Sequence, residues 1–150
     1  MARIPDAGLM AVARVRGVRE SDSRQGLRTA WDEYRAAQTK VDELRAQLAR
    51  ADDFVTGSAP EFQALRQTVA MLGDALIAAE DARDAAQVIS QSAYARWQYD
   101  RTRLAAVEML LDRRATERRA EMDRAEARQL DDVAVQRWLR DRDAEGGVAS

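Results

Sequence analysis

The residues of this chain that could support chemistry are a few closely spaced carboxylates in its C-terminal third. Asp131 is adjacent to Asp132, and Glu117 lies four residues before Glu121, so either pair could hold a cation or act in acid–base catalysis. The chain has no histidine and no cysteine, which excludes imidazole catalysis, thiol nucleophiles and Cys/His zinc sites. Its glycines are scattered, and none forms a phosphate-binding loop. We therefore interpret the carboxylates as a solvated helix face and expect no catalytic residue, no cofactor, no metal site and no enzyme activity.

Basic residues cluster in the same region, at Arg113, Arg114, Arg118 and Arg119. Acidic residues dilute the cluster, and the whole chain has 24 basic against 26 acidic residues. Nucleic-acid binding requires a basic excess that displaces counterions from phosphates. The charge balance therefore favours a protein partner over a nucleic acid.

The helices that carry these charged residues are indicated by two apolar stripes with the spacing of a coiled coil. In each stripe the apolar residues alternate steps of three and four, which keeps one face of a helix towards a partner helix. The first stripe consists of Leu27, Ala30, Tyr34, Ala37, Val41, Leu44, Leu48 and Ala51. The second begins with Phe62, Leu65, Val69, Leu72, Leu76 and Ala79. It continues through Ala86, Ala93, Trp97, Leu104, Val107 and Leu111, with polar interruptions at Arg83, Ser90 and Asp100. The pattern predicts an all-α protein, a long antiparallel two-helix coiled-coil hairpin.

The boundaries follow from helix start and stop signals. We expect a disordered lead-in at residues 1–8, a single coiled-coil domain at 9–145 and a disordered tail at 146–150. Within the domain, helix one covers about 9–52, a turn about 53–59 and helix two about 60–145. Ser58 followed by Glu61 forms a capping box at the start of helix two. Since helix two is much longer, we expect its part beyond Leu104 to overhang as a C-terminal helical arm, densely charged from Asp112 to Glu145.

The first third of helix one is less regular than the rest. Leu9, Val12 and Val15 form an apolar stripe, but Val18 falls out of phase with the stripe that begins at Leu27. A polar stretch, residues 19–26, separates the two and ends on a glycine. This segment could fray, kink or become ordered only against a partner.

Two aromatic positions could act as interface anchors. Trp97 lies on the second stripe between Tyr94 and Tyr99, and core packing is the simpler interpretation of it. Trp138 lies on the expected arm, where it could form either a docking contact or a local helix contact.

Three segments of the second helix carry a family resemblance. They are residues 97–104 (WQYDRTRL), 107–114 (VEMLLDRR) and 124–134 (RAEARQLDDVA). They resemble the FliJ family of bacterial flagellar export proteins, whose C-terminal half has a Trp, a Leu-rich stretch ending in basic residues and a closing hydrophobic-Asp-Glu-x-Ala signature. Asp132 stands where that signature has Glu. The stretch from Leu9 to Glu20 is similar to the apolar opening with Arg-Glu of the same family.

The resemblance implies a fold similar to the central stalk of rotary ATPases. Its implied partners are the hexameric flagellar export ATPase, the cytoplasmic domain of the export gate and export chaperones. The residues that would face the ATPase ring are Arg14, Arg16, Arg19, Arg113, Arg114, Arg118, Leu130 and Asp131, and Trp138 is a further candidate for partner binding. Those nearer the export gate are Tyr34, Val41, Phe62 and Leu65. The implied location is cytoplasmic, peripheral to the inner face of the cell membrane through the export apparatus.

Alternatives remain open. The chain could be the homologous stalk of a virulence-type secretion system, or a generic cytoplasmic coiled-coil scaffold or homodimer. No run approaches the roughly 20 apolar residues of a membrane span, and residues 1–9 lack the layout of a signal peptide. We therefore expect a soluble cytoplasmic protein.

Overall fold

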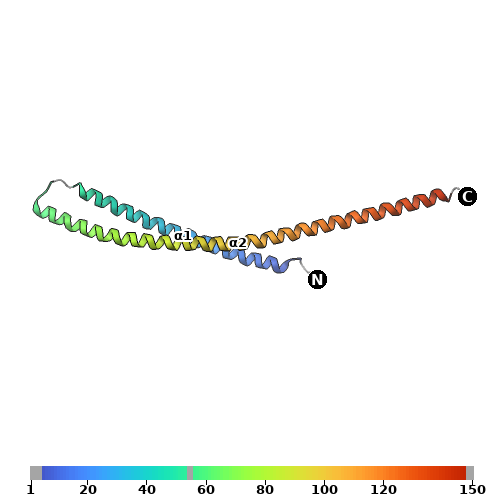
Figure 1. Cartoon of the computed structure of the whole chain (residues 1–150), viewed down its shortest axis with the longest axis horizontal. Coiled ribbons are helices and arrows are strands. Elements are labelled where there is room, and N and C mark those ends of the chain that lie inside the picture. The colour runs from blue at the N-terminus through green and yellow to red at the C-terminus, as the bar shows by residue number, and fades with distance from the viewer. Residues whose placement is uncertain (1–4, 54–55, 148–150) are drawn as a thin grey trace. The chain divides into compact units, whose positions relative to one another are not determined.

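The computed structural model describes residues 5–53 and 56–147, and this part of the chain is helical without any strand. Helix α1 covers Ala7–Asp52 and helix α2 covers Ala59–Gly146 (Figure 1). Helix α1 thus begins two residues before the predicted start, and α2 is one uninterrupted helix of 88 residues. Met1 to Ile4, part of the connection and the last three residues of the tail lie outside the described residues.

The start of α2 follows the predicted capping box. The backbone N–H of Ser58 donates to Glu61 Oε2 at 2.7 Å, and the backbone N–H of Glu61 donates to Ser58 Oγ at 3.4 Å. Each side chain therefore satisfies one backbone donor that the first turn of a helix leaves without an intrahelical partner. Pro60 fits here because a proline in the first turn loses no helical hydrogen bond.

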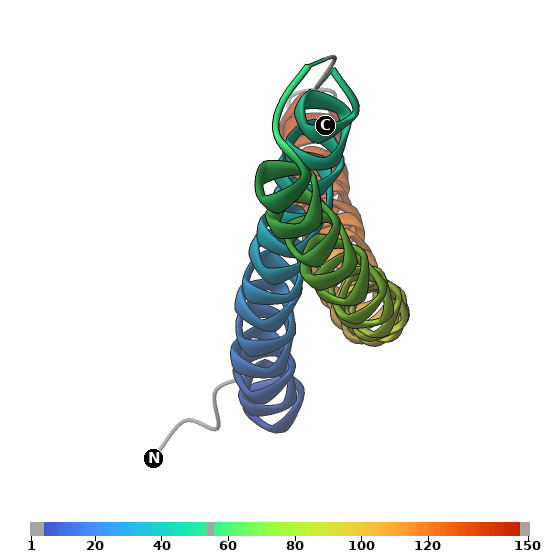
Figure 2. The same ribbon diagram turned by 90° about the vertical axis from the view of Figure 1, so that its left-hand side faces the viewer.

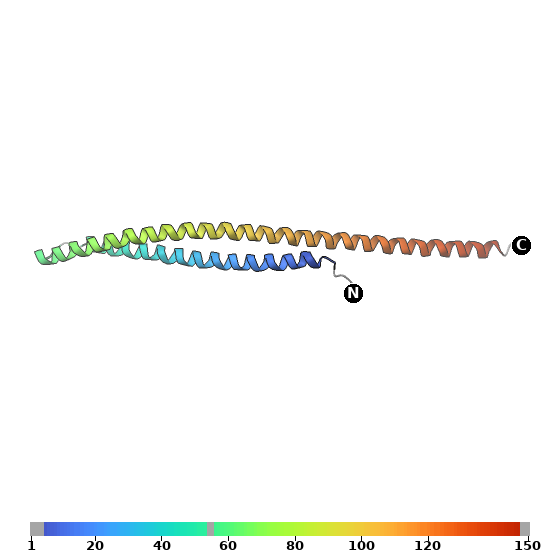
Figure 3. The ribbon, with the colours of Figure 1, turned by 90° about the horizontal axis from the view of Figure 1, so that it is seen from below.

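The chain divides into two compact units, which are described separately. The paired unit comprises residues 13–104, and the terminal unit comprises residues 5–12 together with 105–147. In the paired unit, α1 and α2 lie side by side (Figures 1 and 3). Glu20 contacts Trp97 and Arg45 contacts Glu80, so residue numbers rise along one helix as they fall along the other. The two helices of this unit are therefore antiparallel.

The least exposed positions of the paired unit follow the predicted alternation of three and four residues. On α1 they include Ala13, Arg16, Glu20, Ser23, Leu27, Ala30, Tyr34, Ala37, Val41, Leu44, Leu48 and Ala51. On α2 they include Leu65, Val69, Leu72, Leu76, Ala79, Arg83, Ala86, Ser90, Ala93, Trp97, Asp100 and Leu104. We call this contact face the seam. Its apolar core is confirmed at Leu27, Ala30, Val41 and Leu44, which are buried.

The first third of α1 differs from the prediction. Val12 and Val15, expected to form a stripe with Leu9, are 45% and 55% exposed. Steps of four and three residues from Leu27 towards the N-terminus lead to Ser23 and Glu20, which therefore face α2. Val12 and Val15 lie on the outer face of the helix. The polar stretch is thus part of the contact face, and α1 remains helical through it.

Two serines show how this polar part of the seam is tolerated. Ser23 Oγ donates to the carbonyl of Glu20 at 3.1 Å, and Ser90 Oγ donates to the carbonyl of Gln87 at 2.8 Å. Each buried hydroxyl is therefore satisfied by its own helix, which removes most of the cost of burying it.

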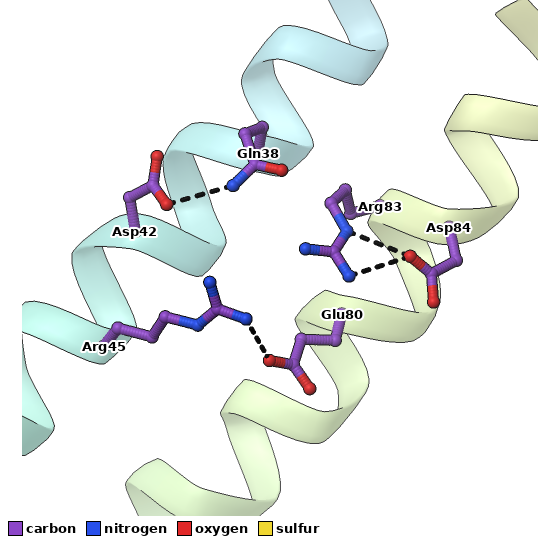
Figure 4. Close-up of polar contacts among 6 residues, drawn as sticks. All are labelled: Gln38, Asp42, Arg45, Glu80, Arg83 and Asp84. Atoms are coloured by element: carbon purple, nitrogen blue, oxygen red, sulfur yellow. Dashed lines mark hydrogen bonds and ion pairs between the residues drawn. The ribbon is translucent and has the colours of Figure 1, made fainter.

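An ion pair joins the two helices nearer the end where α1 finishes and α2 begins, the end that faces the viewer in Figure 2. Arg45 Nη2 lies 2.7 Å from Glu80 Oε1, and Arg83, a seam residue, turns its guanidinium towards the adjacent Asp84 (Figure 4). Within α1, Gln38 Nε2 donates a hydrogen bond to Asp42 Oδ1. The long stem of Arg83 can thus cover the seam while its charge remains at the edge.

Candidate interaction surfaces

In the terminal unit, arginines of the predicted basic cluster pair with two different carboxylates. Arg114 Nη1 lies 2.9 Å from Asp6 Oδ1, and Arg118 pairs with the other oxygen, Asp6 Oδ2. Arg113 instead pairs with Glu117 at 2.9 Å, and both of these side chains are exposed. Because Arg114 and Arg118 are four residues apart, their side chains leave the same face of α2 and converge on one carboxylate. We call Arg114 and Arg118 the arginine fork.

The fork changes the ionisation of its carboxylate. Hydrogen bonds from Arg114 and then Arg118 lower the pKa of Asp6, since both stabilise the charged form. The backbone of Asp6 has a φ of 63°, and its carbonyl accepts a hydrogen bond from the N–H of Met10 at 2.8 Å. Asp6 was expected to belong to a disordered lead-in, so its role was missed. The sequence offers only a weak signal, an aspartate just before the start of a helix.

Trp97 makes contacts within the paired unit. Its side chain is half-buried, and its Nε1 donates to Glu20 Oε1 at 2.9 Å. Glu20 also forms an ion pair with Arg24 at 2.9 Å. Tyr94 lies beside the indole, with a centroid distance of 5.8 Å, and the Arg101 guanidinium lies 5.2 Å from the centroid. Trp97 therefore lies on the contact face between α1 and α2, where a hydrogen bond joins it to α1.

An open groove runs along the paired unit between α1 and α2. It is lined by Arg19, Asp22, Ser23, Gly26, Ala30, Ile89, Ser92, Ala93, Arg96, Tyr99 and Asp100. Asp100 is buried, and no ion pair of the described residues involves it. Sequence reasoning treated Asp100 only as an interruption of the apolar stripe. The groove carries two cations and two anions and so has no net charge preference.

The remaining predicted residues of α1 and of the start of α2 lie in the paired unit. Arg14 and Arg19 are exposed, whereas Arg16 is half-buried on the seam. Tyr34 and Leu65 are half-buried, and Phe62 is exposed. Val41 is fully buried. A direct partner contact through the Val41 side chain would therefore require the helices to separate, and we regard Val41 as a structural residue.

The last part of α2 has a different character. Every described residue from Glu126 to Gly147 is exposed, including Leu130 and Asp131, and we call residues 126–147 the C-terminal segment. Trp138 is 59% exposed, and the guanidinium of Arg142, one turn further along α2, lies 4.9 Å from its centroid. The predicted local helix contact is thus present, and most of the indole surface is still accessible.

Residues 5–53 and 56–147 include no group of three or more carboxylates placed to hold a metal ion. Glu117, Glu121, Asp131 and Asp132 are all exposed, as expected of a solvated face. The described helices include none that is both long enough and apolar enough to cross a membrane.

Comparison with known protein families gives a match. The model of the family described as flagellar FliJ protein matches residues 7–143, nearly the whole chain. No curated protein and no solved structure matches.

Proposed function

Because the chain belongs to the flagellar FliJ protein family, we propose that it acts as a non-enzymatic stalk in the ATPase ring of the flagellar type III export apparatus. The family match over residues 7–143 carries this proposal. It supports a flagellar system over the virulence-type alternative. On this proposal the chain also contacts the export gate and export chaperones.

The C-terminal segment supports a role in contact with another protein. Its described residues are exposed on every side of the helix, so no internal packing stabilises it. A helix of this kind is stabilised by local side-chain pairs or by a partner. Insertion into the pore of a hexameric ring would surround it with such a partner, and its interleaved charges would disfavour one tightly bound orientation.

The decisive experiment measures ATP hydrolysis by the flagellar export ATPase of the same organism, with and without this protein, together with co-elution. Stimulation with co-elution is expected. Reversing Arg113 and Arg114 to Glu should weaken the stimulation, whereas Arg28→Glu, an exposed arginine of the paired unit, serves as the control. Self-association without any effect on the ATPase would favour the homodimer alternative and overturn the proposal.

A further inference from the structure

The arginine fork has the geometry of a carboxylate-binding site. Two guanidiniums on one face of α2 each donate to a different oxygen of the same carboxylate, Arg114 to Oδ1 and Arg118 to Oδ2 of Asp6. Charge-assisted contacts of this kind are stronger and more directional than contacts between neutral groups. The Asp6 side chain is 10% exposed, whereas the side chains of Arg114 and Arg118 are 48% and 42% exposed. The two arginines thus cover the Asp6 carboxylate, while about half of each arginine side chain remains accessible to solvent.

The carboxylate in the fork comes from a strained position of the chain. Among the described residues, Asp6 is the only non-glycine residue with a positive φ. Residues held in this backbone region raise the free energy of the folded chain unless surrounding contacts compensate. Asp6 also precedes the first residue of α1, the place where an aspartate ordinarily caps its own helix. The described hydrogen bonds of its carboxylate go to α2 instead.

We infer that the arginine fork is a docking site for an aspartate or glutamate of a partner protein, and that Asp6 is an internal occupant which this partner displaces. The inference rests on the proposed function in one respect: it takes the export ATPase as the partner that supplies the carboxylate. The Asp6 carboxylate identifies the chemistry that the fork recognises. Its strained backbone and the half-exposed arginines favour exchange of the internal carboxylate for an external one.

An internal occupant lowers the apparent affinity of the fork for any external carboxylate. The observed dissociation constant equals the intrinsic one divided by the fraction of molecules in which the fork is open. If Asp6 occupies the fork in nine molecules out of ten, its removal tightens external binding about tenfold. Asp6 would thus keep the fork closed to weak acidic ligands and yield to a partner that contacts other residues as well.

The first experiment tests the fork without the ATPase. A fluorescein-labelled hexapeptide of alternating Asp and Glu is titrated with the full-length protein, and binding is followed by anisotropy at low ionic strength. Asp6→Asn keeps the size of the side chain and removes its charge, so this variant should bind the peptide more tightly than the wild type, by about tenfold if Asp6 occupies the fork in nine molecules out of ten. Asp6→Ser, tested in parallel with circular dichroism of both proteins, guards against a change of fold specific to one variant.

Matched variants separate the fork from general positive charge. In the Asp6→Asn background, Arg114→Gln with Arg118→Gln should abolish the gain in affinity. Arg119→Gln with Arg124→Gln removes the same charge from two exposed arginines of the same helix and should retain most of the gain. Equal peptide affinity of wild type, Asp6→Asn and Asp6→Ser would overturn the inference, as would an equal loss from both pairs of arginine variants.

The second experiment repeats the comparison with the export ATPase. Asp6→Asn should reach half-maximal stimulation at a lower protein concentration than the wild type. If neither protein binds or stimulates the ATPase while the peptide experiment succeeds, the proposed function fails and the fork remains a carboxylate site. If the ATPase responds equally to both proteins and the peptide affinities are also equal, the inference fails and the proposed function stands.

Discussion

The indole Nε1 of Trp97 donates a 2.9 Å hydrogen bond to Glu20 Oε1, and this bond joins α1 to α2 across the polar part of the seam. Glu20 lies where the spacing of the seam would otherwise place an apolar residue, and its side chain is only 12% exposed. The same carboxylate pairs with Arg24, so its charge is compensated. A hydrogen bond and an ion pair thus take the place of apolar packing in this turn of α1.

We predict that Glu20→Ala lowers the free energy of unfolding by about 1–2 kcal/mol, because it leaves the half-buried indole N–H without its acceptor. Urea denaturation followed by circular dichroism measures the change. Glu33→Ala is the matched control, since Glu33 is an exposed glutamate of the same helix. Equal destabilisation by both substitutions would show that the bond to Trp97 contributes nothing.

The apolar part of the seam should be more sensitive to loss of volume. Val41 is fully buried, so Val41→Ala removes two methyl groups from a packed position and should cost about 2 kcal/mol. Val18→Ala removes the same groups from a side chain of α1 that is 61% exposed, and it should cost much less. Denaturant midpoints of the two variants provide the comparison. Similar midpoints would contradict the assignment of Val41 to the core.

The contacts of Asp6 should depend on pH in a definite direction. Because the arginine fork lowers the pKa of Asp6 in the folded protein, the carboxylate stabilises the fold above the pKa of the unfolded chain. That contribution is lost as the pH falls through the lowered pKa of the folded state. The carboxyl carbon shift of Asp6, followed by NMR, should therefore titrate below the ordinary aspartate range.

Removal of the fork supplies the control for this titration. In the variant with Arg114→Gln and Arg118→Gln, the midpoint of the Asp6 titration should rise, because both cations and both hydrogen bonds are gone. An unchanged midpoint would mean that the arginines do not hold Asp6 in solution.

Residue spacing alone predicted the parts of the fold that depend on local rules. The capping box at Ser58 and Glu61 and the burial of Leu27, Ala30 and Leu44 follow from sequence patterns whose physical basis is local or periodic. The polar start of the seam was missed because Val12 and Val15 offered a competing apolar stripe on another face of the helix. The burial of Glu20 and Ser23 depends on the partner helix, which no local pattern reveals.

The Asp6 contacts were beyond sequence reasoning for a related reason. The carboxylate and the fork are more than 100 residues apart in the chain, with separations of 108 and 112 residues. Nothing in the residue types near Asp6 specifies which of the many arginines it will meet. Only the register of α1 against α2 in the terminal unit determines that pairing.

The exposed indole of Trp138 gives a prediction that separates stability from function. Its described aromatic contact is with Arg142 of the same helix, so Trp138→Ala should change the free energy of unfolding by no more than about 0.5 kcal/mol. If the C-terminal segment enters the ATPase ring, the same substitution should weaken co-elution with the ATPase, because a Trp buried at an interface often dominates binding. Trp31→Ala is the matched control, since Trp31 is an exposed Trp of the paired unit that we do not place at the ring. Equal co-elution of the two variants would show that Trp138 makes no docking contact, and a large loss of stability in Trp138→Ala would show that its packing had been misjudged.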